Sequence, residues 1–421
     1  MTGASPGLAR WSLFGAMLAA AGLPIYINAP KAYVDQYGVG LAALGLVLAG
    51  LRLFDVVQDP VLGWLAEKGR AHRGVWVVVA AVVMAVSMIG LFAVVPPVPP
   101  LVWFALTLAG VFTAYSYLTI VFYAQGVAKA ATLGQGGHLR LAGWREGGAL
   151  AGVTVAAVTP ALLGGFSVFA AGFAVLTLAA VGAMAGQWSA RPPLPPGAAV
   201  PSPADTSSSA VWAAFRPALA DRQARGLLTL SFVNAVPVAI TSTLFLFFVE
   251  SRLEAPAFAG PLLVMFFVAA GVSAPVWSNL AARYGARRAL MGGMVLAIGS
   301  FFGAAFLGAG DLVAFAAICV LSGAALGADM VLLPAMFARR LGQMAQGGEA
   351  AGFGLWNFAS KLSLAFAAGA LLPALQSAGF AAGPGNTPEA LRWLTAAYAV
   401  LPCTLKLLAI ALLAASPNTE E

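Results

Sequence analysis

The sequence predicts an all-α protein that crosses a membrane about twelve times. Of its 421 residues, 61% are hydrophobic and only 9% are charged, and the mean hydropathy is +0.90. A soluble domain carries charge on about a quarter of its residues, because its surface must face water. This chain has too few charges to cover such a surface, so lipid is the expected solvent for most of it.

Long apolar segments are the second observation, because a span needs roughly 20 mostly apolar residues. Between them, the stretch Trp188–Arg225 is rich in Pro, Ser and Ala, which is typical of a flexible linker. We therefore predict an N-terminal six-helix bundle over 1–187, a cytoplasmic linker over 188–225 and a C-terminal six-helix bundle over 226–421. The predicted spans lie near 11–29, 39–65, 75–95, 101–126, 143–163, 166–187, 226–249, 257–281, 288–308, 312–336, 350–374 and 391–414.

The distribution of Lys and Arg is the third observation, because basic residues accumulate on the cytoplasmic side of membrane proteins. If both termini are cytoplasmic, only Lys31, Arg252 and Arg392 fall on the outer side. We therefore predict a multi-pass protein of the cell membrane, or of the inner membrane in a Gram-negative bacterium, with both termini in the cytoplasm. The net charge of +7 then reflects topology and lipid contact, so we expect no nucleic-acid partner. Fifteen basic residues fall on the cytoplasmic side: Arg10, Lys68, Arg70, Arg73, Lys129, Arg140, Arg191, Arg216, Arg222, Arg225, Arg283, Arg287, Arg288, Arg339 and Arg340.

A weak internal repeat supports a duplicated architecture. WLAEKGRAHR at 64–73 resembles NLAARYGARR at 279–288, and each follows a predicted span. Parallel halves with basic turns at matching places are typical of transporters built from two six-helix repeats.

Two carboxylates lie inside the second predicted span, where ionisable groups are costly and need a reason. Asp55 and Asp59 are four residues apart, and Arg52 precedes Asp55 by three, so all three share one helix face. Carboxylates one turn apart repel unless a cation or proton lies between them. The pattern predicts a sodium or proton site, with Arg52 balancing charge. The alternative is a structural salt bridge between Arg52 and one aspartate, which leaves the second aspartate unexplained.

Further ionisable residues lie in predicted spans, among them Arg145 and Glu146 at the start of the fifth. Arg145 begins the fifth span, where it either reaches the interface or lines a pore. Lys361 lies too deep to reach the interface, so we expect it to face the interior and pair with an aspartate of the second span. We expect Asp329 to pair with Arg145 or Lys361, or to bind substrate. Lys406 is near the cytoplasmic end of its span, so we expect its side chain to extend to the interface.

The fourth span carries polar side chains at helical spacing. Ser116, Thr119 and Tyr123 recur at intervals of three and four, which places them on one face and favours a polar cavity there.

Residue types that mark other functions are scarce. Cys319 and Cys403 are too few for a disulfide framework and lack metal-ligand spacing. His72 and His138 fall in short polar stretches, so we expect solvated loop residues. With no nucleophile–base pair or metal-ligand set, the sequence predicts no enzyme and no resident cofactor. The only long loop is of low complexity, which disfavours a receptor or scaffold.

Several motifs together resemble one known family. The second span reads RLFDVVQDPVLGWLAE, similar to R-x-x-D-x-x-x-D-P-x-x-G, and the eleventh reads FGLWNFASKLSLAFAAG, similar to G-L-W-N-F-x-x-K-L-x-x-A. NTPEALRWLTAAYAVLP and RLAGWREGGALAG resemble two further elements. The chain thus resembles, over nearly its whole length, the glycoside–pentoside–hexuronide:cation symporters of the major facilitator superfamily.

The resemblance implies a major-facilitator-type fold of twelve transmembrane helices, and it implies roles for particular residues. Asp55 and Asp59 fall on the family's cation-binding carboxylates and would hold the metal if the ion is sodium. Gln58 stands where an Asn is usual, and Ser116 where a Thr hydroxyl contributes. Arg145 and Lys361 fall on the family's interior basic residues near the two sites. We expect Thr119, Tyr123, Asp329 and Trp356 to complete the substrate site.

The sequence also departs from the family. Met17 and Thr119 stand where sugar permeases have the aspartates that bind sugar hydroxyls, and Tyr123 stands where an aromatic residue, usually Trp, stacks on the sugar. We therefore expect sodium- or proton-coupled symport of a small polar solute, such as a sugar, by alternating access. The alternative is cation-coupled transport of an amphipathic or anionic molecule such as a lysolipid. We expect a monomer in the lipid bilayer.

Overall fold

The computed structural model of the protein describes residues 7–22, 29, 32–34, 36–162, 165–188, 208–344, 348–380 and 385–416. Within these ranges the chain forms helices and turns and no β-strand. The chain divides into two compact units, Met1–Asp221 with Ala338–Phe358 (unit 1) and Arg222–Phe337 with Ala359–Glu421 (unit 2). The domain bounds at 187 and 226 stay predictions, and much of the expected linker, 189–207, lies outside the described residues.

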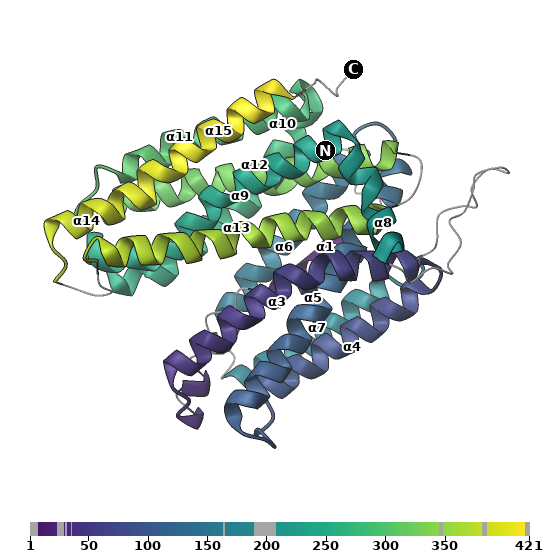
Figure 1. Ribbon diagram of the computed structural model, residues 1–421, viewed down its shortest axis with the longest axis horizontal. Coiled ribbons are helices and arrows are strands. Elements are labelled where there is room, and N and C mark those ends of the chain that lie inside the picture. Colours follow the sequence, from purple (N-terminus) through teal and green to yellow (C-terminus); the bar gives the residue numbers. More distant parts are fainter. Residues whose placement is uncertain are drawn as a thin grey trace. The chain divides into compact units, whose positions relative to one another are not determined.

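Unit 1 contains the helices of the first half of the chain. In Figure 1, α3, α4, α5 and α7 run alongside one another, and α1 packs against α6. α5 is the central element, because it contacts α3, α4 and α6. The helices are α1 (Leu8–Ala20), α3 (Leu41–Lys68), η1 (Arg70–His72), α4 (Arg73–Phe92), α5 (Pro100–Ala131), α6 (Gly137–Leu162), α7 (Phe166–Ala183) and α8 (Ser208–Ala220).

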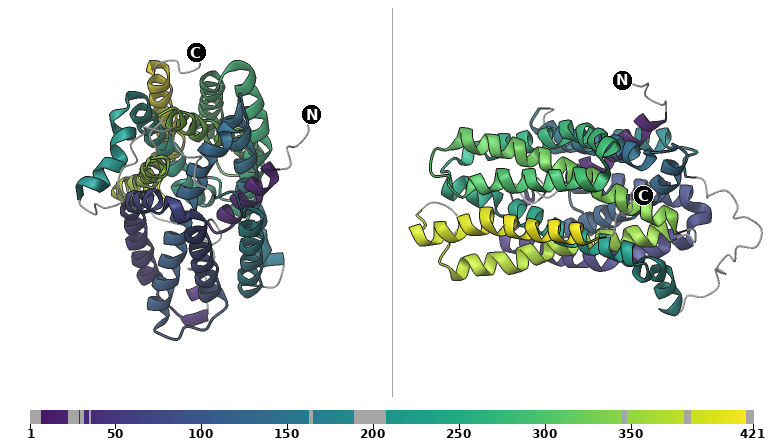
Figure 2. Two further views of the ribbon diagram at one scale, coloured as in Figure 1. Left: turned by 90° about the vertical axis from the view of Figure 1, so that its right-hand side faces the viewer. Right: turned by 90° about the horizontal axis from the view of Figure 1, so that it is seen from above.

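Unit 2 contains the helices of the second half, which run lengthwise beside one another in Figure 2. α9 packs along α15, which also contacts α11. α12 and α13 cross the unit boundary, at Phe337 and Phe358 respectively. The elements are α9 (Arg222–Phe247), η2 (Phe248–Arg252), η3 (Pro256–Phe258), α10 (Ala259–Tyr284), α11 (Ala286–Ala304), α12 (Leu312–Gln343), α13 (Glu349–Ser377), α14 (Pro388–Thr395), η4 (Ala396–Val400) and α15 (Leu401–Ala415).

The predicted all-α membrane fold is confirmed, since each of the twelve predicted segments coincides with a helix in the described residues. Residues 23–28, in the first segment, and residue 163, at the end of the fifth, lie outside the described residues. Within the described part of the chain, seven helical stretches are long and apolar enough to cross a membrane by length and composition alone. They are Arg70–Phe92, Pro100–Ala131, Phe166–Ala183, Arg222–Arg252, Pro256–Tyr284, Leu312–Gln343 and Pro388–Ala415. Among the others, α3 carries the charged residues that the sequence marks as functional candidates.

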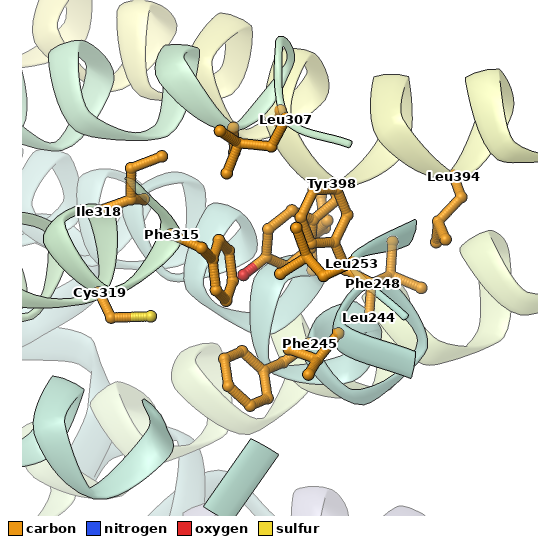
Figure 3. Packing of buried hydrophobic residues seen from close by; sticks show 14 of the residues in the cluster. Leu244, Phe245, Phe248, Leu253, Leu307, Phe315, Ile318, Cys319, Leu394 and Tyr398 are labelled. Carbon is orange, nitrogen blue, oxygen red and sulfur yellow. The ribbon is translucent and has the colours of Figure 1, made fainter. Parts of the chain in front are cut away.

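An aromatic cluster forms part of the core of unit 2 (Figure 3). The rings of Phe248 and Tyr398 stack with centroids 4.2 Å apart, and the Phe315 ring lies 5.4 Å from that of Phe248. Phe248 and Tyr398 both belong to single π-helical turns, η2 and η4. Pro402 follows η4, and because proline lacks an N–H it cannot complete the usual helical bond to the carbonyl four residues before it.

Helices α1 and α6 approach closely because small residues face one another. A Cβ on Gly148 would lie 2.1 Å from the Ser12 carbonyl oxygen, and one on Gly152 would lie 2.2 Å from that of Ala16. Residues four apart share a helix face, so the two glycines form a continuous groove for α1. Small residues at such spacing let membrane helices pack backbone to backbone.

We predict that Gly152→Val separates α1 from α6 and lowers the melting temperature of the purified protein substantially. Gly147 is the matched control, because a Cβ there meets no atom within 4 Å. Gly147→Ala should leave the melting temperature unchanged or raise it slightly, since Ala favours a helix by about 1 kcal/mol over Gly. Equal melting temperatures for the Gly152→Val variant and the wild type would contradict this packing.

The two histidines differ in environment. His72 is exposed in η1, as expected, whereas His138 is partly buried in the first turn of α6. The expectation that both are solvated loop residues is therefore wrong for His138. Burial, followed by the positive charges of Arg339 and Arg145, lowers the pKa of His138 to about 4.

This lowered pKa predicts a pH dependence of stability. The unfolded chain has a histidine pKa of about 6.5, so between pH 6.5 and 4 it binds more protons than the folded protein. The contribution of neutral His138 is fully present above pH 6.5 and is lost progressively as the pH falls towards 4. We expect melting temperatures to fall less steeply over this range in His138→Gln than in the wild type. His72→Gln, the exposed control, should follow the wild type, and parallel curves for all three proteins would contradict the assignment.

Candidate functional site

Asp55 is the centre of a buried polar network between α3 and α5. Its side chain is 5% exposed, and its Oδ1 accepts hydrogen bonds from Gln58 Nε2 at 2.8 Å and from Ser116 Oγ at 3.0 Å. Gln58 lies one turn after Asp55 on α3, so the first bond follows from helical spacing. Ser116 comes from α5, so the second bond exists only because the two helices pack together.

Thr113 extends this network and is absent from the sequence-based candidates. Its Oγ1 donates to Gln58 Oε1 at 3.0 Å, so the Gln58 amide has a partner for both its nitrogen and its oxygen. The signal that could have identified it is its spacing, because Thr113 precedes Ser116 by three residues on the same face of α5. Four oxygen-bearing side chains therefore meet within unit 1: Asp55, Gln58, Thr113 and Ser116.

Asp59 lies one turn beyond Asp55 and is fully buried. At this point α3 crosses the beginning of α13, which belongs to the same unit. A Cβ on Gly354 would lie 2.9 Å from the Asp59 carbonyl oxygen, and one on Gly63 would lie 2.9 Å from that of Ala350. The two glycines thus allow the backbones to touch beside the second carboxylate.

A second buried polar cluster joins α5 and α6. The Arg145 guanidinium lies over the Tyr123 ring, 3.6 Å from its centroid, and Arg145 Nε donates to Glu146 Oε1 at 2.8 Å. Tyr123 Oη donates to the same Glu146 oxygen at 2.7 Å. Arg145 and Glu146 are 4% and 3% exposed. Arg145 therefore lies inside unit 1 and does not extend to the interface. Glu146, to which the sequence assigns no role in the site, neutralises the charge of Arg145.

Two polar atoms near this cluster have no hydrogen-bond partner within the described ranges. They are Arg145 Nη2 and Thr119 Oγ1, and both are buried. Thr119 lies one turn before Tyr123 on α5, so its hydroxyl is on the face that carries the cluster. The ring of Phe353, from the first part of α13, lies 5.2 Å from the ring of Tyr123. The arrangement provides an aromatic wall with a donor and a hydroxyl that a ligand could engage.

The face of α5 connects the two clusters. Ser116, Thr119 and Tyr123 lie along it, and seven residues of α-helix span about 10 Å. The Asp55 network and the Arg145 cluster therefore lie roughly two helical turns apart along one rigid element.

The remaining sequence candidates lie as follows. Trp356 is buried on the part of α13 that belongs to unit 1, whereas Lys361 is half-buried on the part that belongs to unit 2. Arg52 is half-buried one turn before Asp55. Their proposed roles in charge balance and substrate binding stay predictions. Among the residues that the structure describes, no group of three or more His, Cys, Asp or Glu could hold a metal ion.

Two expectations about side-chain contacts in the second half are wrong, whereas a substrate-binding role for Asp329 stays a prediction. Lys406 does not reach the interface, because it is 4% exposed and its Nζ donates to Asp329 Oδ2 at 2.5 Å. Asp329 accordingly pairs with Lys406 and not with Arg145 or Lys361. The same ammonium donates to Asn234 Oδ1 at 2.7 Å. The three side chains come from α15, α12 and α9, so their meeting depends on helix packing in unit 2.

Comparisons with known proteins agree with this architecture. A family model described as MFS/sugar transport protein, where MFS denotes the major facilitator superfamily, matches residues 11–419. No curated protein sequence is significantly similar to the chain.

Three solved transporter structures are similar to this chain in fold. A bacterial homologue of the iron transporter ferroportin, in an outward-facing state, is 14% identical with a TM-score of 0.68, over 97% of this chain and 98% of that one. The same homologue with soaked iron has a TM-score of 0.67 at 14% identity, over 96% and 98% of the two chains. The human organic anion transporter MFSD10 (TETRAN) is 16% identical with a TM-score of 0.61, also over 96% and 98%. At these identities the likeness shows the fold alone.

We predict that Glu146→Gln destabilises the protein by about 3 kcal/mol, because it leaves the buried charge of Arg145 uncompensated. The measurement is the free energy of unfolding, or the melting temperature, of the purified variant. The control is Arg70→Gln, which breaks the partly exposed Arg70–Glu67 pair on α3 and η1. Exposed pairs contribute about 0–1 kcal/mol, so this variant should remain close to the wild type. A Glu146→Gln variant as stable as Arg70→Gln would show that the buried pair is not needed.

Proposed function

The chain belongs to the MFS/sugar transport protein family, and we propose that it is a symporter that couples a sodium ion or a proton to uptake of a small polar solute. The family and the fold make it a multi-pass membrane transporter and not an enzyme. The observation that carries the finer proposal is the buried Asp55 network, which brings carboxylate, amide and hydroxyl oxygens from α3 and α5 together.

The chemistry of this network suits a coupling cation. Sodium and protons both favour oxygen ligands, and a carboxylate in an apolar interior gains most from a positive charge close by. Asp59 adds a second carboxylate one turn further along the same helix, fully buried. A bound cation would reduce the repulsion between the two carboxylates and draw α3 and α5 together. The cation site would therefore be made of Asp55, Asp59, Gln58 and Ser116, to which we add Thr113.

The Arg145 cluster supports a substrate site on the same helix. Arg145 Nη2 can donate to a ligand oxygen, Thr119 Oγ1 can donate or accept, and Tyr123 and Phe353 offer aromatic surface. Because α5 carries both clusters, ordering of its face by a cation would lower the cost of binding solute beside Tyr123. A carrier loaded with only one of the two ligands would then cross less readily between its outward and inward states, which is the basis of coupling.

The charge of the cluster bears on the solute. Glu146 already neutralises Arg145, so the site does not need an anionic group and suits a neutral hydroxylated solute such as a sugar. The alternative is an amphipathic or anionic molecule such as a lysolipid. The observation that favours it is the presence of Met17 and Thr119 where related sugar permeases have carboxylates. Competition by neutral sugars and by lysolipids for uptake into proteoliposomes would separate the two.

The placement of the protein is also part of the proposal. The basic residues between α3 and α4 and between α10 and α11 support a cytoplasmic location for these turns, and hence for both termini. We propose that the protein acts as a monomer in the cell membrane.

Thermal stability in the presence and absence of sodium tests the cation site. We predict that sodium at constant ionic strength, with choline as the replacement ion, raises the melting temperature of the wild type and not that of Asp55→Asn. A ligand present at a hundred times its dissociation constant stabilises by about 2.7 kcal/mol. Glu389→Gln, which changes an exposed carboxylate of α14, is the control and should retain the sodium response.

Repeating the measurement over a range of pH identifies the ion. A pH-dependent melting temperature that Asp55→Asn abolishes, without a sodium response, indicates a proton. Coupling at this site would be refuted if neither sodium nor pH changed the melting temperature of the wild type in a way that Asp55→Asn abolishes. In proteoliposomes Asp55→Asn should also lose gradient-driven accumulation of solute.

A further inference from the structure

Three polar side chains form a buried cluster inside unit 2, apart from the cation site proposed above. Lys406 donates to Asp329 and to Asn234, and the three side chains are 4%, 8% and 3% exposed. The pair of opposite charges is electrically neutral as a whole. The cluster is buried, so each remaining hydrogen-bonding position on it carries a cost if it is left empty.

The cluster has hydrogen-bonding capacity that the described part of the protein does not use. Asp329 Oδ1 is buried and has no partner there. An ammonium group has three N–H donors, and those of Lys406 are directed to two protein acceptors, Asp329 Oδ2 and Asn234 Oδ1. One acceptor and one donor are thus left side by side. The group that satisfies both at once is a hydroxyl, which donates through its proton and accepts through its oxygen.

A cavity lies at this position. It has a volume of about 40 Å³ and is lined by Asp329 and Lys406, with Thr241, Ser322 and apolar side chains including Phe301. A buried water needs roughly 10–15 Å³ on this measure, so the cavity holds about three waters or an organic group of similar size. The hydroxyls of Thr241 and Ser322 donate to the backbone oxygens of Val238 and Cys319, which leaves their lone pairs as acceptors.

The charges around the cavity select a neutral occupant. A cation would meet the Lys406 ammonium, and an anion would meet the Asp329 carboxylate. Because the Lys406–Asp329 pair is neutral as a whole, neither a cation nor an anion would gain a net attraction that offsets its lost hydration. A neutral molecule with several hydroxyl groups instead finds three acceptors and one donor.

One wall residue of the cavity, Phe301, packs against the aromatic cluster drawn in Figure 3. The Phe301 ring lies 5.9 Å from the ring of Tyr398, which stacks on Phe248. Pro237 and Pro402 also line the cavity and lie within α9 and α15, where each removes a helical N–H. A proline in a membrane helix leaves a carbonyl without its usual helical donor, and neighbouring groups or water can satisfy that carbonyl.

We propose that this cavity is a binding site for a neutral hydroxylated ligand, with Asp329 as the principal acceptor and Lys406 as the donor. Its hydroxyls come from a small polyol or from one end of a larger sugar-like molecule. The inference goes beyond the proposed cation coupling and does not depend on it, because every residue involved belongs to unit 2.

The reactivity of Cys403 can show whether the cavity is occupied. Cys403 lines the cavity, whereas Cys319, the other cysteine, is buried in the hydrophobic cluster and does not line it. The experiment measures alkylation of both cysteines by iodoacetamide in the purified full-length protein, resolved by peptide mass spectrometry. The probe is glycerol, added to protein that was prepared without it. We expect glycerol to slow the alkylation of Cys403 at least threefold, with an effect that saturates as the glycerol concentration rises. The rate of Cys319 alkylation should be nearly the same with and without glycerol.

Variants show whether protection needs the charged pair. The double variant Asp329→Asn/Lys406→Met removes both charges together, which avoids leaving one uncompensated, and it should lose the protection. Ser322→Ala removes a single acceptor and should weaken protection even if the double variant does not fold.

Four outcomes would overturn the proposal. Glycerol that leaves the Cys403 rate unchanged would mean that the cavity holds water alone. Equal slowing at both cysteines, or equal protection in the variants, would mean a general solvent effect. Failure of Cys403 to react without glycerol, under conditions that modify it in unfolded protein, would mean that the cavity admits no molecule of this size.

Discussion

The hydrocarbon interior of a membrane offers no water to polar groups, and the internal organisation of this protein follows from that single constraint. Backbone groups satisfy it by forming helices over almost all of the described residues. Ionisable side chains satisfy it only by finding partners inside the protein, since each costs about 2.5–3.5 kcal/mol to insert. Arg145 with Glu146 and Lys406 with Asp329 are two buried pairs of this kind.

The buried pairs differ in how they are assembled, and this difference separates their roles. Arg145 and Glu146 are neighbours in sequence, so their pairing survives any small movement between helices, and Tyr123 brings α5 to them. Lys406 and Asp329 are 77 residues apart and come from different helices. Their contact therefore depends on the packing of α12 against α15. It also involves α9, whose Asn234 accepts a hydrogen bond from Lys406.

Close helix packing makes these contacts possible, because short polar side chains such as Ser116 reach a partner only when backbones lie near each other. Glycines provide this approach at two crossings of unit 1. Gly148 and Gly152 admit α1 to α6, which carries Arg145, and Gly63 and Gly354 bring α13 against α3 beside Asp59. The polar clusters therefore depend on small residues nearby, which let the helices approach closely enough for short polar side chains to meet.

Incomplete satisfaction is what distinguishes a candidate binding site from a structural ion pair. The Arg145 cluster keeps one guanidinium nitrogen without a partner in the described structure, and the Lys406 cluster keeps one carboxylate oxygen. A purely structural pair would be expected to use all of its hydrogen-bonding capacity, because an empty position in an apolar interior is unfavourable. Each leftover atom specifies the chemistry of what can bind there: an acceptor beside Arg145 and a hydroxyl beside Asp329.

The sequence by itself determined the features that depend on local spacing. Hydropathy over 20-residue windows located the helices, and helical periodicity placed Asp55 and Gln58 on one face of α3 and Ser116, Thr119 and Tyr123 on one face of α5. The resemblance to a symporter family placed Ser116 with Asp55 in one expected cation site. A hydrogen bond joins the two side chains, and the cation site itself stays a prediction.

Only the tertiary structure decided which distant side chains meet. It assigned Lys406 to Asp329, brought Thr113 to Gln58 and placed Tyr123 on Arg145. Periodicity identifies the face of a helix on which a residue lies, but it does not identify the helix that the face meets or the depth at which they cross. The expectation for Lys406 is wrong for this reason, because a lysine near the end of a span can reach either water or a buried carboxylate. The choice depends on the side chains that neighbouring helices present to it.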